Sequence, residues 1–529
     1  MKKVIIFALA ALPLMAVQAQ DTYLNDRATN TSDVIGTARY VGMGGAMGAL
    51  GADISAISNN PASIGLMRRG TLSMTLGGQI NDAKPAYGDS RGSFTFDQIG
   101  FVFPFGDVSD DNRVNFAFNY QKKINYNQGI NTSQNLGGLS QGDMFAWIAN
   151  STFKENTSGY YFDSPFYDNL YTAGFFSEFT NEFGDSYFRN VNAGEKGYYY
   201  RNSSGSLQGY DFNISGSVQD RWFWGLTFGI DHMIYRHSAS YEEVGDDPYI
   251  LYQDQKLKGY GFNVKGGVIV RPVEDSPFRI GFAVESPSWY VLEHTGLAAL
   301  SVSDGRGGYT KASYMDDDNY LEYNVYSPWK FRPLMLGFTI EDYFAFDFEL
   351  EYAMNNFMKM GYPENDDYYY DYGGSTISMT KDRAMNEMTK NNINGVLNAR
   401  LGFEVKPVPK MALRAGYNFY TRLYKPGARL DQTCDTPAWD WSTSTEYINL
   451  NSKTQLITLG LGYQGKHFYA DLAYKYRVQR GDFYAFDDQF TTLNESFCFE
   501  NPDLAGKTLT PTEVNLDRHN IAVTLGYRF

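Results

Sequence analysis

Three carboxylates recur at every second position of one apolar segment: Asp347, Glu349 and Glu351. Successive side chains of a β-strand point to opposite faces, so these three are expected to share one face. Neighbouring carboxylates repel one another unless cations pair with them. We therefore predict ion pairs to arginines of the two following segments or of the stretch ahead of the first segment: Arg400, Arg414, Arg68 and Arg69. Such a face could steer an anionic ligand, but the favoured interpretation is structural, the docking of another part of the chain.

No other grouping of residues indicates catalysis or metal binding. The five His residues are scattered, and no Ser/His/Asp grouping suggests hydrolysis. The acidic runs "MDDDNY" (315–320) and "ENDDYYYDY" (364–372) lack the ligand spacing of a Ca²⁺ loop. We expect no enzyme activity, no metal and no cofactor. Cys434 and Cys498 lie in predicted loops and could form a disulfide in an oxidising compartment, a question that the sequence leaves open.

The first nineteen residues have the pattern of a secretory signal peptide. Lys2 and Lys3 precede an apolar stretch, and Val17-Gln18-Ala19 forms a small-residue cleavage site. Beyond it, no apolar run approaches the roughly 20 residues that a membrane helix needs. The formal charge of −15 argues against nucleic acid or anionic lipid as a partner.

Alternation of apolar with small or polar residues dominates the rest of the chain. In the last nine residues, Ile521, Val523, Leu525, Tyr527 and Phe529 alternate with Ala, Thr, Gly and Arg. The second face of such segments mixes Gly, Asn and charges, as the inside of a barrel would. Fourteen segments share the pattern: 71–80, 94–103, 113–122, 206–219, 221–235, 257–271, 278–293, 320–340, 343–356, 393–406, 410–422, 454–464, 467–478 and 515–529.

The lengths of the connections agree with a barrel. After the second segment, short connections such as "PVEDSP" and "KPVPK" alternate with long ones such as 123–205 and 357–392. Membrane barrels have tight periplasmic turns and long external loops. The sequence thus predicts an all-β fold, a 14-stranded antiparallel transmembrane β-barrel spanning residues 71–529. We expect a monomer in the outer membrane of a Gram-negative bacterium, surrounded by lipid and lipopolysaccharide. The terminal Phe529 resembles the signal that the barrel insertion machinery reads.

Residues 20–70 are too polar and too rich in Gly for a strand of the wall. Small residues between Gly44 and Ala52 would allow close packing in a confined bore. Pro61 disfavours helix at Asn60, so "NNPAS" indicates a turn. We expect this extension to fold into the lumen as an N-terminal hatch, or plug.

The run "MGGAMGALGADISAISNNPASIGL" resembles the N-terminal signature of the FadL/TodX family of outer-membrane transporters for hydrophobic compounds such as long-chain fatty acids. "FRIGFAVESPSW" (278–289) and "LRAGYNFY" (413–420) are similar to recurring strands of that family. The resemblance implies a fourteen-stranded barrel with a hatch. It places Asp53, Ser55 and Ala56 on the family's Asp-x-Ser-Ala step, and Asn60, Pro61 and Ala62 on its Asn-Pro-Ala turn. These six residues could bind ligand, although folding and seating of the hatch is the favoured role.

The resemblance also implies a function, uptake of long-chain fatty acids or aromatic hydrocarbons by diffusion through a channel that the hatch gates. The alternative is a protein-interaction barrel that serves as an accessory component of protein secretion. The family opens its wall sideways through a kink in the third strand. Here "RVNFAFNYQK" contains neither Gly nor Pro, so a kink would require a bulge that the sequence does not indicate.

Overall fold

The computed structural model describes most of the chain from Asp33 to Phe529. The residues outside the description are 1–32, 82–91, 107–110, 145–179, 184–185, 190–193, 247, 274–275, 303–308, 316–320, 341–342, 364–378, 382, 427–446, 450–452, 487, 489–490 and 492–501.

The described strands form a closed antiparallel barrel with fourteen positions around the wall. In order around the wall, these are β1 (Thr71–Asn81), β2 (Gly92–Phe105), β3 (Arg113–Asn125), β7 (Lys196–Val218), β8 (Trp222–Val244), β9 (Tyr249–Val270), β10 (Arg279–Glu285), β14 (Lys330–Ile340), β15 (Phe344–Ala353), β18 (Val396–Val408), β19 (Met411–Tyr420), β21 (Thr454–Gln464), β22 (Phe468–Val478) and β25 (Arg518–Arg528). The last strand pairs back with the first, from Thr71↔Arg528 to Asn81↔Arg518. This pairing closes the cylinder, and the predicted fold class is confirmed.

The two faces of the wall differ as the alternation predicts. On β8, Trp222, Trp224 and Leu226 are exposed on the outer face, while Phe223 and Thr227 are buried on the inner face. The inner face carries Asn, Ser, Thr and charged side chains on most strands, and the exposed large apolar residues come mainly from the outer face. The outside of the cylinder is therefore apolar and its inside polar.

Two predicted strands are each broken by a proline. Segment 278–293 divides at Pro287 into β10 and β11 (Trp289–Val302), and segment 320–340 divides at Pro328 into β13 (Leu321–Tyr326) and β14. Proline has no N–H to donate to the ladder. The two breaks lie side by side, since the Ser288 N–H donates to Ser327 Oγ at 2.7 Å and the Ser327 N–H donates to the Ser288 carbonyl at 3.0 Å.

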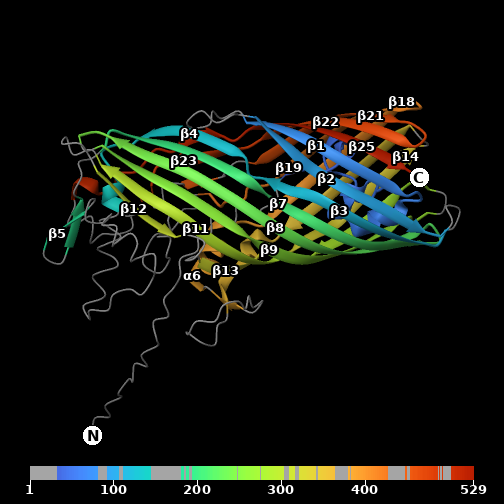
Figure 1. Ribbon diagram of the computed structural model, residues 1–529, viewed down its shortest axis with the longest axis horizontal. Helices are drawn as coiled ribbons and strands as arrows, with labels where there is room; N and C mark the ends of the chain where they lie inside the picture. Colours follow the sequence, from blue (N-terminus) through green and yellow to red (C-terminus); the bar gives the residue numbers. More distant parts are fainter. Residues whose placement is uncertain are drawn as a thin grey trace, which may run out of the picture.

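Beyond these breaks, further strands extend the sheet at the end of the barrel that lies away from the short connections. β11 pairs with β9, β13 and β12 (Tyr309–Met315), β13 pairs with β16 (Lys359–Pro363), β16 with β17 (Met379–Lys381), and β4 (Gln128–Asn135) with β7. Smaller sheets are β20 (Tyr447–Asn449) with β23 (Arg480–Tyr484) and β24 (Thr512–Asn515), and β5 (Thr180–Phe183) with β6 (Ser186–Arg189). In Figure 1 the C-terminus lies at one end of the barrel, and β4, β5, β12 and β23 lie toward the other.

The described helical elements are short: α2 (Ala38–Gly42), η1 (Ile54–Ser58), η2 (Pro61–Leu66), η3 (Asn355–Phe357), α6 (Arg383–Asn392) and η4 (Pro502–Leu504). Within the described residues no helix has the length and apolar character to cross a membrane. The largest apolar cluster joins inner-face residues of the long strands, such as Tyr199 and Tyr241, to Phe483 and Leu504 of the C-terminal third of the chain.

Candidate functional site

The described part of the N-terminal stretch, residues 33–70, lies inside the barrel and contacts inner-face side chains of several strands. Asn115 of β3 donates to the Ile64 carbonyl at 2.6 Å, Asn213 of β7 to the Pro61 carbonyl at 3.3 Å, and Thr458 of β21 to the Gly42 carbonyl at 3.1 Å. Most of its residues are buried. We call residues 33–70 the N-terminal segment; it is the dark blue ribbon within the barrel in Figure 1.

Asp53 is the N-cap residue of η1, and it also forms hydrogen bonds with Thr37, the N-cap residue of α2. Its carboxylate accepts the Ser55 N–H at 2.9 Å, the N-cap arrangement that a short polar side chain provides. The Thr37 hydroxyl contacts both Asp53 oxygens, at 2.7 and 2.8 Å, and the Thr37 N–H donates to Ser55 Oγ at 2.9 Å. Ala56 is fully buried, and its carbonyl accepts the N–H groups of the two asparagines that follow η1. The Asp-x-Ser-Ala step therefore shapes the backbone of the segment.

Asn60 and Pro61 begin η2 and place it against the wall. Asn60 Oδ1 accepts the Ala62 N–H at 3.1 Å, and Pro61 occupies the first turn, where its missing N–H costs nothing. Asn60 Nδ2 also donates to the Val268 carbonyl of β9 at 3.3 Å. Ala62 packs with Phe223 of β8 and with an isoleucine of β9. All three residues of the Asn-Pro-Ala turn thus contact the barrel.

Asp347 and Glu349 of β15 bind backbone N–H groups of the N-terminal segment. Asp347 accepts from Ala49 at 3.2 Å and from Leu50 at 2.6 Å. Glu349 accepts from the N–H groups of Met47, at 2.8 Å, and Gly48. Both side chains are fully buried, so these hydrogen bonds replace those that the carboxyl groups lose with water.

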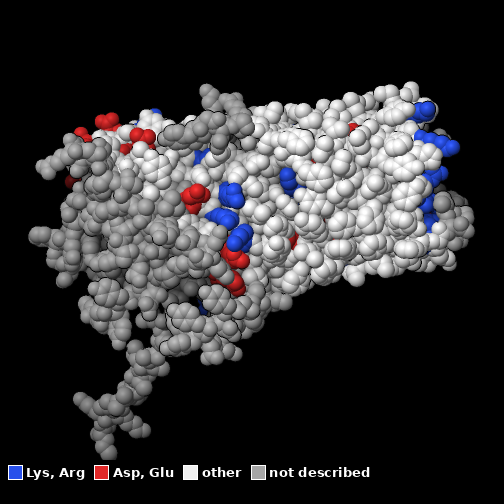
Figure 2. Space-filling model, in the orientation of Figure 1, with Lys and Arg blue, Asp and Glu red and all other residues white. Residues whose placement is uncertain are grey.

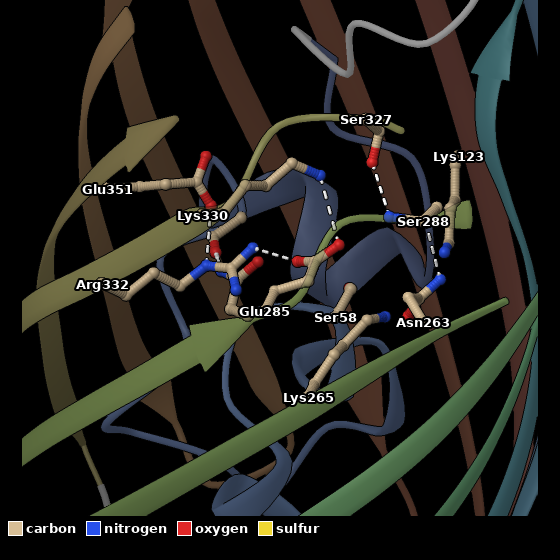
Figure 3. Close-up of polar contacts among 12 residues, drawn as sticks. Ser58, Lys123, Asn263, Lys265, Glu285, Ser288, Ser327, Lys330, Arg332 and Glu351 are labelled. Atoms are coloured by element: carbon tan, nitrogen blue, oxygen red, sulfur yellow. Dashed lines mark hydrogen bonds and ion pairs between the residues drawn. The ribbon is translucent and has the colours of Figure 1, made fainter. Parts of the chain in front are cut away.

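Arg400 of β18 joins two of the predicted carboxylates. It lies 3.1 Å from Glu349 and 2.9 Å from Glu351. Glu351 lies 2.6 Å from Arg332 of β14 as well, and Arg332 lies 3.0 Å from Glu285 of β10. Figure 3 shows Arg332 between the two glutamates, with Lys330 reaching Glu285. The result is a chain of alternating charges across four neighbouring strands, β18, β15, β14 and β10.

Arg414 does not join this chain. It lies directly opposite Glu404 across the β18–β19 pair and bonds it at 2.6 Å, and it bonds Asp471 of β22 at the same distance. Arg39 of the N-terminal segment lies 3.1 Å from Glu404. The strand register therefore gives Arg414 partners nearer than the β15 carboxylates. Glu404 was missed by the sequence analysis, although two-residue steps from Arg400 place it on the same face.

The arginines ahead of β1 also differ from the predicted pairing. Arg68 lies 2.9 Å from Asp220, in the turn between β7 and β8, and Asp220 also binds Arg113 and Arg271. Asp220 gathers these cations at the end of the barrel where the connections are short. Arg69 is exposed.

Further inner-face pairs were not identified from the sequence. Lys123 of β3 lies 2.5 Å from Asp231 of β8, and Lys265 of β9 lies 3.1 Å from Asp211 of β7. Figure 3 shows both lysines among the polar side chains inside the barrel. The alternation of residue types indicates that each of these side chains points inward. Only the register between strands shows which charged residues form pairs.

Two carboxylates of the N-terminal segment have shifted pKa values of opposite sign. Burial raises the pKa of Asp53 and outweighs the lowering effect of Arg39 and the Asp53 hydrogen bonds. Burial would also raise the pKa of Asp33, but the charges of Lys475 and Arg477 hold it below its ordinary value. Asp33 is therefore an ionised anchor, and Lys475 also donates to the Val34 carbonyl at 2.8 Å.

The third strand does carry a bulge. Its register with β7 shifts between Lys122 and Ile124, and its pairing with β2 extends from Gln98↔Gln121 to Phe105↔Val114. A bulge inserts one extra residue and bends the strand without requiring Gly or Pro. The absence of both residues from "RVNFAFNYQK" was thus no guide to the shape of the strand.

Cys434 and Cys498, with the acidic run 364–372, lie outside the described residues.

No family model matches the chain, and no curated protein matches it. Among solved structures, a Pseudomonas aeruginosa FadL homologue is similar with 12% identity and a TM-score of 0.48, over 94% of this chain and 99% of that one. The P. putida toluene transporter TodX is similar with 12% identity and a TM-score of 0.45, over 94% and 99%. The Ralstonia pickettii toluene transporter TbuX is similar with 13% identity and a TM-score of 0.43, over 93% and 97%.

Proposed function

We propose that the protein is an outer-membrane channel for the uptake of hydrophobic small molecules, in the manner of FadL/TodX transporters. Residues 1–19 are removed as a signal peptide, residues 20–70 act as the hatch, and residues 71–529 form the barrel. The observation that carries the proposal is a closed barrel, apolar outside, whose bore holds its own N-terminal segment through many polar contacts.

The outer face supports placement in a membrane. A barrel in lipid needs an outward apolar band about 25 Å tall. Exposed apolar side chains follow one another along single strands, as do Ile457, Leu459, Leu461 and Tyr463 on β21. Because the one chain closes the cylinder, no further copy is needed and we propose a monomer in contact with lipid and lipopolysaccharide. Secretion and insertion would proceed through the signal peptide and the barrel insertion machinery.

The contacts of the N-terminal segment support gating. Hydrogen bonds and ion pairs to the wall can break and re-form, so the hatch can shift without a covalent step. The buried ion pairs of the inner face, such as Lys265–Asp211, favour a ligand path that avoids the middle of the bore. The β3 bulge, where pairing with β2 ends, offers a sideways exit into the membrane.

Uptake assays test the proposal directly. Cells of a host that lacks its own fatty-acid channel should take up radiolabelled oleate or toluene faster when they produce the protein. A disulfide between the hatch and the wall, made by Gly48→Cys and Met335→Cys, should stop uptake until reductant is added, because an ideal Gly48 Cβ would lie 2.6 Å from Met335 Sδ, within reach of a shorter side chain at position 335. Unchanged uptake with the disulfide intact would contradict gating by the hatch.

Purification separates this function from the other classes. A stoichiometric protein partner together with no uptake of either compound would favour the accessory secretion barrel. Large steady conductance in planar bilayers would favour a general porin, because a bore that holds 33–70 should conduct ions poorly. Oleate and toluene are tested separately, since the ratio of the two uptake rates identifies the substrate class.

A further inference from the structure

The outer face changes from apolar to charged at one level on adjacent strands. On β9, Val268, Val264 and Tyr260 are exposed apolar or aromatic residues, and the next two outward residues are Lys258 and Lys256. The register places Tyr260 opposite His232 of β8 and Val291 of β11, and places Lys258 opposite Ile234 and Glu293. The boundary is therefore shared by three neighbouring strands.

This boundary lies one membrane thickness from the short-turn end of β9. From Val270 to Tyr260 the strand rises about 33 Å at roughly 3.3 Å per residue, which a tilt of about 40° reduces to about 25 Å along the barrel axis. That height equals the apolar band of outer-membrane barrels. The first residue of β1, Thr71, and the last residue of β25, Arg528, lie at the opposite rim. The charged level therefore faces the outer leaflet.

Three cations gather at this level: Arg236, Lys256 and Lys258, which we call the basic patch. Arg236 lies directly opposite Lys256 in the β8–β9 register, and Lys258 is the next outward residue of β9. Carboxylates lie among these cations: Glu293 is 2.8 Å from Lys258, and Asp254 is the next outward residue of β9 after Lys256. Figure 2 shows Lys, Arg, Asp and Glu side chains gathered in a belt on this face, beside a broad surface almost free of charge.

We propose that the basic patch binds the phosphate groups of lipopolysaccharide in the outer leaflet. This inference depends on the proposed location in the outer membrane. Arg236 can hold a phosphate through two parallel N–H donors, while the lysines add compact positive charges. The acyl chains of the same molecule would lie against Tyr260 and the apolar band below it. Since the whole chain carries a formal charge of −15, its overall field repels anionic lipid, and the affinity must come from this local cluster.

The test compares three forms of the full-length protein extracted from outer membranes. The patch variant is R236Q/K256Q/K258Q. The matched control, K406Q/K410Q/K466Q, removes the same charge near the short connections at the opposite rim. Each form is titrated in a neutral detergent with purified lipopolysaccharide, with enzymatically dephosphorylated lipopolysaccharide and with phosphatidylglycerol. Heat-modifiable migration in gels verifies that each barrel is folded.

We expect the patch variant to bind lipopolysaccharide at least tenfold more weakly than the wild type and the control. Wild-type protein should bind the dephosphorylated lipid as weakly as the patch variant binds the intact one. Equal binding by the folded patch variant and the control would overturn the proposal, and so would equal wild-type affinity for phosphatidylglycerol. A wild-type protein absent from the outer membrane would instead refute the proposed function.

Discussion

Adjacent inner-face carboxylates of β15 have different partners. Asp347 and Glu349 bind backbone N–H groups of the N-terminal segment, whereas Glu351 binds Arg332 and Arg400 of the wall. The difference follows from their level in the bore: the first two face the segment and the third lies beyond it. The carboxylates of this one strand therefore bind the N-terminal segment and also form ion pairs with neighbouring strands.

We predict that Glu349→Gln loosens the N-terminal segment. The variant keeps the size of the side chain but removes the charge that accepts from Met47, Gly48 and Asn59. Hydrogen bonds to a charged group contribute about 1.5–3 kcal/mol, so amide exchange at residues 47–50 should accelerate about tenfold or more. Hydrogen-exchange mass spectrometry checks this. Glu322→Gln on β13 is the control, and equal exchange in the two variants would contradict the prediction.

We predict that Asp33 makes stability depend on acidic pH. Its folded-state pKa lies below the ordinary 3.8, so its stabilisation is complete above 3.8 and is lost as the pH falls through the folded-state value. Loss of one partner from a buried pair costs about 3 kcal/mol or more. In urea unfolding from pH 6 to 2.5, the free-energy difference between wild type and Asp33→Asn should shrink below pH 3.8. The exposed Asp503→Asn should give no such trend; a constant difference for Asp33→Asn would refute the role.

At the scale of elements, glycines of the wall allow the segment to approach. On β19, an ideal Cβ at Gly416 would collide with backbone atoms of Met43 and Gly44. On β8, a Cβ at Gly225 would collide with Pro61 in the same way. These inner-face glycines stand where the segment's backbone touches the strands, so the wall and the segment are fitted to each other. Alternation marks such glycines as inward but does not reveal what they contact.

We therefore predict that Gly416→Ala displaces the N-terminal segment. Overpacking of a tight contact costs about 1–3 kcal/mol, and the added methyl group would meet backbone rather than a flexible side chain. Gly266→Ala on β9 is the matched control, because nothing lies within 4 Å of its ideal Cβ. Limited proteolysis should cut residues 40–50 faster in the first variant only. Identical cleavage rates in both variants would show that the contact of Gly416 with Met43 and Gly44 does not hold the N-terminal segment in place.

At the scale of the molecule, closure depends on the pairing of β1 with β25. The last residue lies at this seam: the Phe529 N–H donates to the Gly70 carbonyl at 3.0 Å, and its ring lies 5.5 Å from that of Phe103. The side chain is 53% exposed, so its packing contributes less than that of a core residue. Phe529 is therefore placed to stabilise the β1–β25 pairing and to be recognised by the barrel insertion machinery.

We predict that Phe529→Ala slows assembly more than it weakens the finished barrel. The exposed ring should cost the folded protein about 1 kcal/mol or less. Pulse-chase labelling should show delayed appearance of the heat-modifiable form in the outer membrane, while urea unfolding of the refolded barrel stays nearly unchanged. Val523→Ala, at an outward position of the same strand, is the control. Normal assembly kinetics would exclude recognition of the terminal aromatic residue.

The sequence by itself determined the fold class, the fourteen positions of the wall and its two faces, but not the breaks at Pro287 and Pro328 or the strands beyond the wall. A strand has a side-chain period of two, and the partition between lipid and bore selects residue types position by position. Pro61 likewise predicted a turn at Asn60, whereas Asp53 was singled out by the family resemblance; both residues cap short helices in the structure.

Only the tertiary structure decided which charges meet and where the wall departs from regularity. Partners such as Arg414 and Glu404 are set by the register between strands, and Asp220 meets Arg68 because η2 packs against β7 and β8. The breaks at Pro287 and Pro328 become one paired feature only when their strands lie side by side. The bulge at Lys122 arises from pairing with β7, a relation that no local pattern in β3 contains.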